Sequence, residues 1–219
     1  MSEPARLYIR PEAPNAVKVL IFLAERGLAV ETIDVATLAD EDFARVSSLK
    51  QVPVLVTATG LAITESLTIC QHLDAVAEGP SLFGDKLEAR TLVAMWERRA
   101  ELMLFDVCIE YGHHTQPIFA GRLPQFPDWA KAHAAKAAPM LVIMEAQLGA
   151  NRFLAGPAFS MADITAYLGI GGLALWGALP ATPGPAVQRW MGEMEARPSM
   201  APLRALSERF RPPEAHEAG

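Results

Sequence analysis

Cysteine is scarce in this sequence, and an excess of positive charge is missing. Of the 219 residues only Cys70 and Cys108 are cysteines, and both lie in apolar, helical patterns. Two cysteines are too few for the disulfide framework of a small secreted protein, and they lack the spacing of a zinc site. The formal net charge is −6, whereas nucleic-acid binding needs a basic surface. We therefore expect neither a metal site nor a nucleic-acid partner.

Long apolar runs are also missing. Pro4, Pro11 and Pro14 interrupt the first apolar segment, which does not have the form of a signal peptide. The segment most like a membrane span, residues 164–180, is short and rich in glycine. Hydrophobic residues still make up 51% of the chain, which excludes a mainly disordered state. We expect a cytoplasmic protein with a substantial core and no membrane partner.

The first 80 residues alternate extended and helical patterns. The patterns predict strands at 7–9, 30–35, 52–56 and 61–63, the last two as a hairpin, and helices at 14–26, 40–46 and 65–76. The order is β-α-β-α-β-β-α. Its βαβ beginning requires a parallel strand pair with a right-handed crossover.

Strand patterns end with the Gly-Pro pair at 79–80. Beyond it we expect a helix at 86–111, a loop at 112–127, a helix at 129–148 bent at Pro139, helices at 160–175, 187–196 and 201–209, and a frayed tail from Pro212. Ser160 and Asp163 have the spacing of a capping box. We predict domains at 1–80 and 88–219 with a linker at 81–87. A single α/β domain is the alternative, but the second half offers no strands to extend the sheet.

Several motifs occur in a specific order along the chain. They are Gln51-Val52-Pro53-Val54-Leu55, then Thr64-Glu65-Ser66 opening a helix, then the cap at 159–164 ahead of Ala166. By these motifs, and over essentially its whole length, the chain resembles the glutathione transferase superfamily. The resemblance implies an α/β thioredoxin-like N-terminal domain that binds glutathione, an all-helical C-terminal bundle that holds a co-substrate, and a homodimer.

The resemblance also implies a glutathione site formed by Gln51, Val52, Pro53, Glu65 and Ser66. A cis Val52–Pro53 bond would turn the Val52 backbone toward an extended peptide. The helix N-terminus at Ser66 suits a carboxylate and Glu65 suits an ammonium, and the γ-glutamyl end of glutathione carries both groups. Gln51 would serve the cysteinyl-glycine end. The alternatives are a trans proline at a sheet edge, a simple helix cap, and an exposed strand residue.

The motif expected near the thiol of glutathione departs from the pattern of the family. The opening Ala13-Pro14-Asn15 resembles the Ser-Pro-Asn or Thr-Pro-Asn motif of bacterial members, with Ala13 in place of the hydroxyl residue. Asn15 is the candidate donor to a thiolate, or else a helix cap. Tyr8 is a weaker candidate and is favoured as a core residue.

Leu104, Cys108 and Tyr111 are candidate walls of an apolar co-substrate pocket, although core packing explains Leu104 and Cys108 equally well. We predict an enzyme that directs the glutathione thiolate at a small apolar electrophile. The alternatives are a non-catalytic or regulatory glutathione-binding protein, favoured by Ala13, and a glutathione-dependent disulfide reductase.

Overall fold

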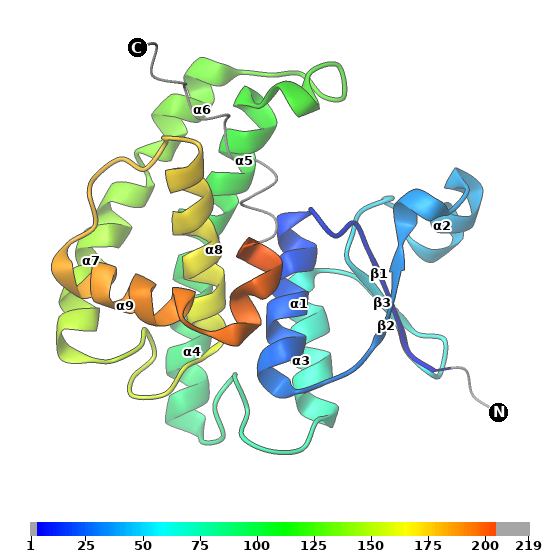
Figure 1. Ribbon diagram of the computed structural model, residues 1–219, viewed down its shortest axis with the longest axis horizontal. Coiled ribbons are helices and arrows are strands. Elements are labelled where there is room, and N and C mark those ends of the chain that lie inside the picture. The colour runs from blue at the N-terminus through cyan, green and yellow to red at the C-terminus, as the bar shows by residue number, and fades with distance from the viewer. Residues whose placement is uncertain (1–3, 205–219) are drawn as a thin grey trace, which may run out of the picture.

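A four-stranded mixed sheet forms the N-terminal part of the computed structural model, which describes residues 4–204 (Figure 1). The strand order is β2-β1-β3-β4. The central strand β1 (Arg6–Ile9) pairs in parallel with β2 (Glu31–Asp34) and antiparallel with β3 (Val54–Val56). The short edge strand β4 (Ala62–Ile63) pairs antiparallel with β3. The predicted strands and the parallel first pair are confirmed.

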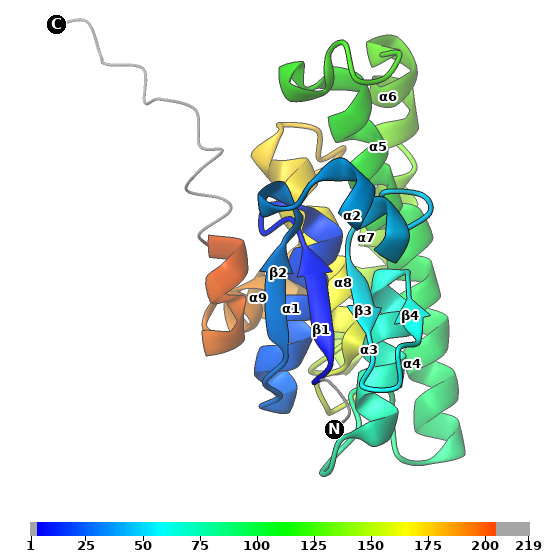
Figure 2. The ribbon, with the colours of Figure 1, turned by 90° about the vertical axis from the view of Figure 1, so that its right-hand side faces the viewer.

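Three helices accompany this sheet: α1 (Pro14–Arg26), α2 (Asp40–Val46) and α3 (Ser66–Val76). In Figure 2, α1 and α3 lie behind the sheet, and α2 lies at its upper end. Pro14 occupies the first position of α1, where its missing N–H costs no hydrogen bond. Gly27 ends α1 at a φ of 61°, a conformation that glycine adopts without strain. The predicted order β-α-β-α-β-β-α is therefore confirmed.

The rest of the described chain is helical. Its elements are α4 (Leu87–Ala100), the π-helical segment η2 (Glu101–Phe105), α5 (Asp106–Thr115), the 3₁₀ turn η3 (Pro117–Phe119), α6 (Pro127–Ala134), α7 (Ala137–Ala150), α8 (Met161–Leu175), α9 (Pro185–Glu195) and the 3₁₀ turn η4 (Pro198–Met200). Figure 1 shows α1 and α3 between the sheet and this helical part. One continuous hydrophobic core extends from β1 to η4 across both parts. None of the helices within residues 4–204 is long and apolar enough to cross a membrane.

Two predicted helices differ from the structure. The helix expected at 86–111 continues to Thr115 and contains the π-helical segment, so the loop begins later than expected. The helix expected at 129–148 with a bend from Pro139 begins at Pro127 and is divided into α6 and α7 at residues 135–136. Pro139 lies in the first turn of α7 and has no N–H to donate to the carbonyl of residue 135, four positions earlier, so the division lies where a proline interrupts a helix.

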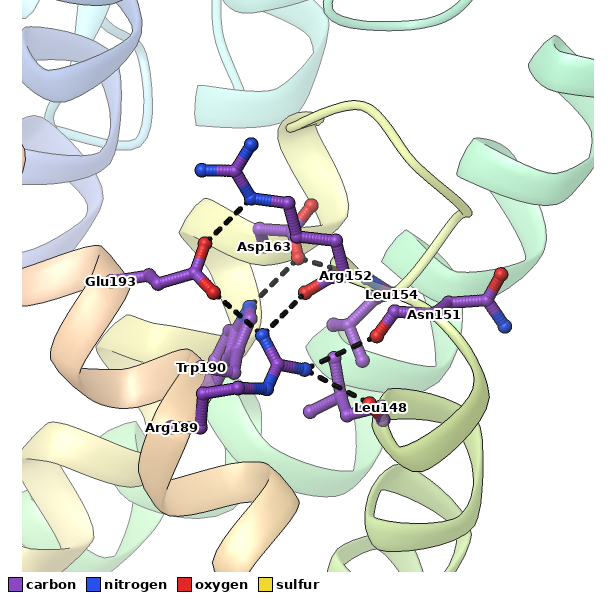
Figure 3. A network of polar contacts seen from close by, with 8 residues as sticks. All are labelled: Leu148, Asn151, Arg152, Leu154, Asp163, Arg189, Trp190 and Glu193. Atoms are coloured by element: carbon purple, nitrogen blue, oxygen red, sulfur yellow. Dashed lines mark hydrogen bonds and ion pairs between the residues drawn. The ribbon is translucent and has the colours of Figure 1, made fainter.

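The predicted capping box at the start of α8 is present. Asp163 is completely buried, and its carboxylate accepts hydrogen bonds from the Ser160 N–H at 3.0 Å, the Leu154 N–H at 3.0 Å and the Trp190 Nε1–H at 2.9 Å. Figure 3 shows Asp163 between Leu154 and Trp190, next to the exposed ion pairs of Glu193. Burial raises the pKa of Asp163, although these hydrogen bonds oppose the rise. Asp163 thus ties α8 to α9 and to the preceding loop.

The remaining boundaries agree in part with the sequence analysis. Helix α3 ends at Val76 and α4 begins at Leu87, so most of the predicted linker at 81–87 lies in their connection. The domain limits themselves stay a prediction. The helix expected at 201–209 is helical at 201–204, and the rest of it, like the tail from Pro212, lies outside the described residues.

Candidate functional site

The N-termini of α1 and α3 are joined by one side-chain hydrogen bond. The hydroxyl of Ser66, the first residue of α3, donates to Oδ1 of Asn15, the second residue of α1, at 2.7 Å. The two residues are 51 positions apart in the sequence. Ser66 is buried and Asn15 is half-buried. The N-cap of α1 is Ala13, so Asn15 does not cap its helix. Within residues 4–204 its Nδ2 group has no hydrogen-bond partner.

Glu65 lies next to this pair in an unusual backbone conformation. Its φ is 64° and its ψ is 118°. A non-glycine residue with positive φ costs of order 1 kcal/mol or more, and such residues cluster at functional sites. Glu65 occupies the N-cap position of α3, yet its side chain makes no capping hydrogen bond and is exposed. The Ser66 hydroxyl is committed to Asn15, so neither residue acts as an ordinary side-chain cap.

The segment before β3 forms the third part of the site. The Val52–Pro53 peptide bond is cis, as the resemblance implied. The backbone pairing between β1 and β3 ends at Val54, so the N–H and C=O of Val52 lie beyond the sheet. Gln51 is exposed. Its backbone is fixed by the buried Ser47, whose Oγ accepts from the Gln51 N–H and donates to the Gln51 C=O, each at 3.2 Å.

Tyr8 lies on the other face of the sheet. Leu7 and Ile9, its neighbours in β1, are buried in the main core that includes α1 and α3. Because side chains alternate along a strand, Tyr8 points the opposite way. It packs against a second, smaller cluster formed by Val35, Phe43 and Val54. This arrangement favours the packing alternative for Tyr8 and separates it from Asn15.

A cavity of about 580 Å³ opens beside the start of α1. Its lining includes Glu12, just before α1, and Pro14, the first residue of α1. Cys108 and His113 of α5 line it as well, together with Gly172 near the end of α8 and Trp176 just beyond that end. Most of the other lining side chains are apolar, and the volume suits a small organic molecule. The cavity thus begins at Pro14, next to Asn15, and continues between the helices of the C-terminal part.

Only one of the three predicted pocket residues lines this cavity. Cys108 does so. Leu104 is fully buried in the core, because α8 comes close to it at Gly169, where an added Cβ would lie 2.6 Å from the Leu104 carbonyl carbon. Tyr111 stacks on Trp176 with 6.3 Å between the ring centroids, and so supports the wall rather than forming it.

Comparisons with known proteins decide the family. The family model described as the glutathione S-transferase N-terminal domain matches residues 3–75. Glutathione S-transferase 3 of Zea mays is 30% identical over 216 residues, which cover 90% of this chain and 91% of the relative. The chain belongs to the glutathione S-transferase superfamily. Glutathione S-transferase 2 of Saccharomyces cerevisiae is 28% identical, covering 93% of this chain and 91% of the relative. The crystal structure of a glutathione S-transferase domain-containing protein of Marinobacter aquaeolei VT8 has a TM-score of 0.79 and 32% identity, covering 89% of this chain and 99% of that one.

The two cysteines of this glutathione S-transferase superfamily member lie in environments that disfavour a thiolate. Both thiols are free and buried. Burial raises the pKa of Cys108 to about 12 and raises that of Cys70 as well, which favours the protonated, less reactive thiol at both positions. Among residues 4–204, no group of three His, Cys, Asp or Glu side chains has the arrangement that a metal ion needs.

The sequence did not predict the roles of several residues of the site. Ser47 carries no local motif, so nothing in the sequence predicted its two bonds to Gln51. Gly112 allows Trp176 to reach the cavity wall, since an added Cβ would lie 2.4 Å from the indole ring. Gly172 leaves space for Cys108 in the same way, at 2.3 Å from Sγ. The sequence shows that the segment of α8 is rich in glycine, but it does not show that α5 packs against these glycines.

Proposed function

We propose that this protein is a glutathione transferase that binds glutathione at the joined N-termini of α1 and α3. The observation that carries the proposal is the hydrogen bond between Ser66 and Asn15. It brings the residue expected at the γ-glutamyl end next to the residue expected at the thiol. Both helices also present their positive ends there, which favours anionic groups of a ligand. The relatives in Zea mays and Saccharomyces cerevisiae are named glutathione S-transferases, which supports the same ligand.

Each part of the site then has one task. Glu65 pairs with the α-ammonium group of glutathione, and the first N–H groups of α3 bind its α-carboxylate. The Val52 backbone pairs with the cysteinyl residue as an added strand would. Gln51 donates its side-chain amide to the glycine carboxylate. Asn15 donates from Nδ2 to the sulfur, because its oxygen is already held by Ser66.

The chemistry needs no covalent intermediate with the protein. The thiolate of glutathione attacks an electrophile held in the cavity, and the protein contributes positioning and stabilisation of the anion. The cavity starts at Glu12 and Pro14, so an electrophile bound there lies beside the sulfur. Its mainly apolar walls favour a small, largely apolar electrophile. The buried cysteines favour transfer over a mechanism with a protein thiol.

A second function has one observation in its favour. Ala13 has no hydroxyl to offer the thiolate, and a protein that keeps the glutathione site without turnover would tolerate this change. Such a protein would bind glutathione with an unperturbed thiol pKa. Asn15 distinguishes the two functions, because its Nδ2 donor has no purpose in mere binding of the peptide backbone.

We also propose a homodimer in the cytoplasm. Leu87, Leu92 and Met95 of α4 expose 76%, 43% and 37% of their surfaces, and exposed apolar side chains on one helix favour a protein–protein contact. The two free thiols suit a reducing compartment. Sedimentation at micromolar concentration should give twice the chain mass of 23.7 kDa. A particle of the single-chain mass would exclude the dimer.

Calorimetry with S-methylglutathione tests the binding site directly. Glu65→Ala should weaken binding at least ten-fold, because an ammonium loses its partner in a partly buried site. Glu78→Ala is the matched control, since Glu78 is also exposed but lies beyond the end of α3. Equal affinities of the wild type and Glu65→Ala would contradict the assignment.

A further inference from the structure

Lys18, in the second turn of α1, is completely buried, and its Nζ has no hydrogen-bond partner among the described residues. Nζ lies 3.9 Å from the centroid of the Phe105 ring, whose negative face attracts a cation. Burial of an ammonium without a hydrogen-bonded partner is costly, and an aliphatic side chain would fill the same space more cheaply. The position of Lys18 near the cavity and near the Asn15–Ser66 pair suggests a functional reason for keeping a lysine there.

Lys18 lies one layer below the cavity. It follows Pro14, which lines the cavity, by about one helical turn. Its ring partner Phe105 precedes Cys108, which also lines the cavity, by about one turn. Lys18 and its ring partner Phe105 are therefore each about one helical turn from a residue that lines the cavity. A side chain on a helix also leans toward the N-terminal turn, which brings the ammonium closer to the start of α1.

The same layering holds between α1 and α3. Asn15 and Ser66 form the hydrogen-bonded pair at the top of these helices. Lys18 and Cys70 follow them by about one turn each, and the charge of Lys18 acts to lower the pKa of Cys70 against the larger effect of burial. Lys18 thus lies about one turn below the Asn15–Ser66 pair and about one turn below Pro14 at the cavity.

The ionisable groups that face Lys18 come from four elements. The pKa of Lys18 is lowered, because burial outweighs the opposing effects of Glu97 of α4, Glu101 of η2, Cys70 of α3 and Asp106 of α5. Glu97 is itself buried, which raises its pKa, and its Oε1 accepts a hydrogen bond from Thr165 of α8 at 3.1 Å. No direct Lys18–Glu97 bond forms. An ammonium at this position therefore has no carboxylate at hydrogen-bond distance to pair with it.

We propose that Lys18 is a long-range electrostatic residue of the active site: its buried ammonium stabilises the thiolate of bound glutathione from beneath Asn15, and Glu97 moderates that effect. The inference rests on the proposed function, since the thiolate belongs to glutathione. It also gives the protein a positive charge where Ala13 offers no hydroxyl. Two unit charges about 10 Å apart, at an effective dielectric constant of about 20, change a pKa by roughly one pH unit.

Ultraviolet titration of the thiolate in the glutathione complex tests the inference. Lys18→Met keeps the length of the side chain and removes its charge, so it should raise the pKa of the bound thiol by about one pH unit. Lys18→Arg should restore the wild-type value. Glu97→Gln keeps the oxygen that accepts from Thr165 and should lower the pKa. A merely structural role of the two residues would not move the pKa in opposite directions.

Controls separate this inference from the proposed function. Affinity for S-methylglutathione, which has no thiol to titrate, should stay within two-fold of wild type in all three variants. If wild type binds no glutathione, the proposed function fails. If wild type binds glutathione but neither Lys18→Met nor Glu97→Gln moves the thiol pKa, only the role of Lys18 is overturned. Should Lys18→Met not fold, Glu97→Gln decides alone: a lowered pKa supports the inference, and an unchanged one contradicts it.

Discussion

The hydroxyl of Ser66 donates a hydrogen bond to the side-chain oxygen of Asn15. The hydrogen bond of 2.7 Å from Ser66 Oγ to Asn15 Oδ1 fixes which end of the Asn15 amide remains for a ligand. The end that remains is Nδ2, with two N–H donors. A thiolate needs donors, and Ala13 supplies none. The pair therefore offers a physical account of how a site without the usual hydroxyl stabilises a sulfur anion.

Removal of the Ser66 hydroxyl should disturb the thiol through Asn15. In Ser66→Ala the Asn15 amide is free to rotate, so it donates to the sulfur for only part of the time. We expect the pKa of the bound thiol to rise by about half to one pH unit and glutathione affinity to fall about two- to ten-fold, the range for a neutral hydrogen bond. Titration and calorimetry measure the two effects. Thr68→Ala, an exposed change in the same helix, should alter neither.

Gly172 should be essential to the packing beneath the cavity. An added Cβ would lie 2.3 Å from Cys108 Sγ, so Gly172→Ala should destabilise the protein by about 1–3 kcal/mol. The double variant Gly172→Ala/Cys108→Ala removes the clash and should recover most of the loss. Gly171→Ala is the control, because nothing lies within 4 Å of its added Cβ. Urea unfolding gives the free energies, and equal stability of Gly172→Ala and Gly171→Ala would refute this packing.

Local patterns in the sequence were enough to predict most of the fold. The strand and helix order of the first part follows from periodicities, and the Ser160–Asp163 box from a three-residue spacing. The interruption expected from Pro139 occurs at residues 135–136, about one turn before the proline, because its missing N–H and its ring act on the carbonyl of residue 135. The π-helical segment at 101–105 lies close to α8 at Gly169, and no local pattern in the sequence predicts this contact.

The candidate site also depends on contacts that local sequence patterns do not predict. Asn15 and Ser66 could be named from the sequence, but their contact joins segments 51 residues apart. Leu104 and Tyr111 were expected in the pocket wall, and their true positions depend on how α8 packs at Gly169 and where Trp176 lies. No pattern in the sequence predicts the burial of Lys18.

Glu25 and Arg197 should make stability depend on pH. They form a bidentate pair, 172 residues apart, with both distances 2.6 Å. Burial acts to raise the pKa of Glu25, but the hydrogen bonds from Arg197 and Ser199 and the Arg197 charge outweigh burial and lower it. A lowered carboxyl pKa stabilises the folded state above the unfolded pKa of about 4.3 and loses this effect as pH falls through the folded pKa.

Glu25→Gln tests this dependence. We expect it to destabilise the protein by about 1–3 kcal/mol at pH 7, the range for hydrogen bonds to a charged group, and by progressively less below about pH 4. Urea unfolding at a series of pH values measures the difference from wild type. Glu41→Gln, an exposed change in α2, should show little difference at any pH. A Glu25→Gln difference that does not vary with pH would contradict the role of the ion pair.

Ultraviolet titration of the thiolate in the glutathione complexes of wild type and Asn15→Ala tests the central claim most directly. A hydrogen bond to a charged acceptor contributes about 1.5–3 kcal/mol, so Asn15→Ala should raise the pKa of the bound thiol by about one to two pH units. Tyr8→Phe should leave it unchanged, because Tyr8 packs on the other face of the sheet. An unchanged pKa in Asn15→Ala, together with a raised pKa in Tyr8→Phe, would contradict the account.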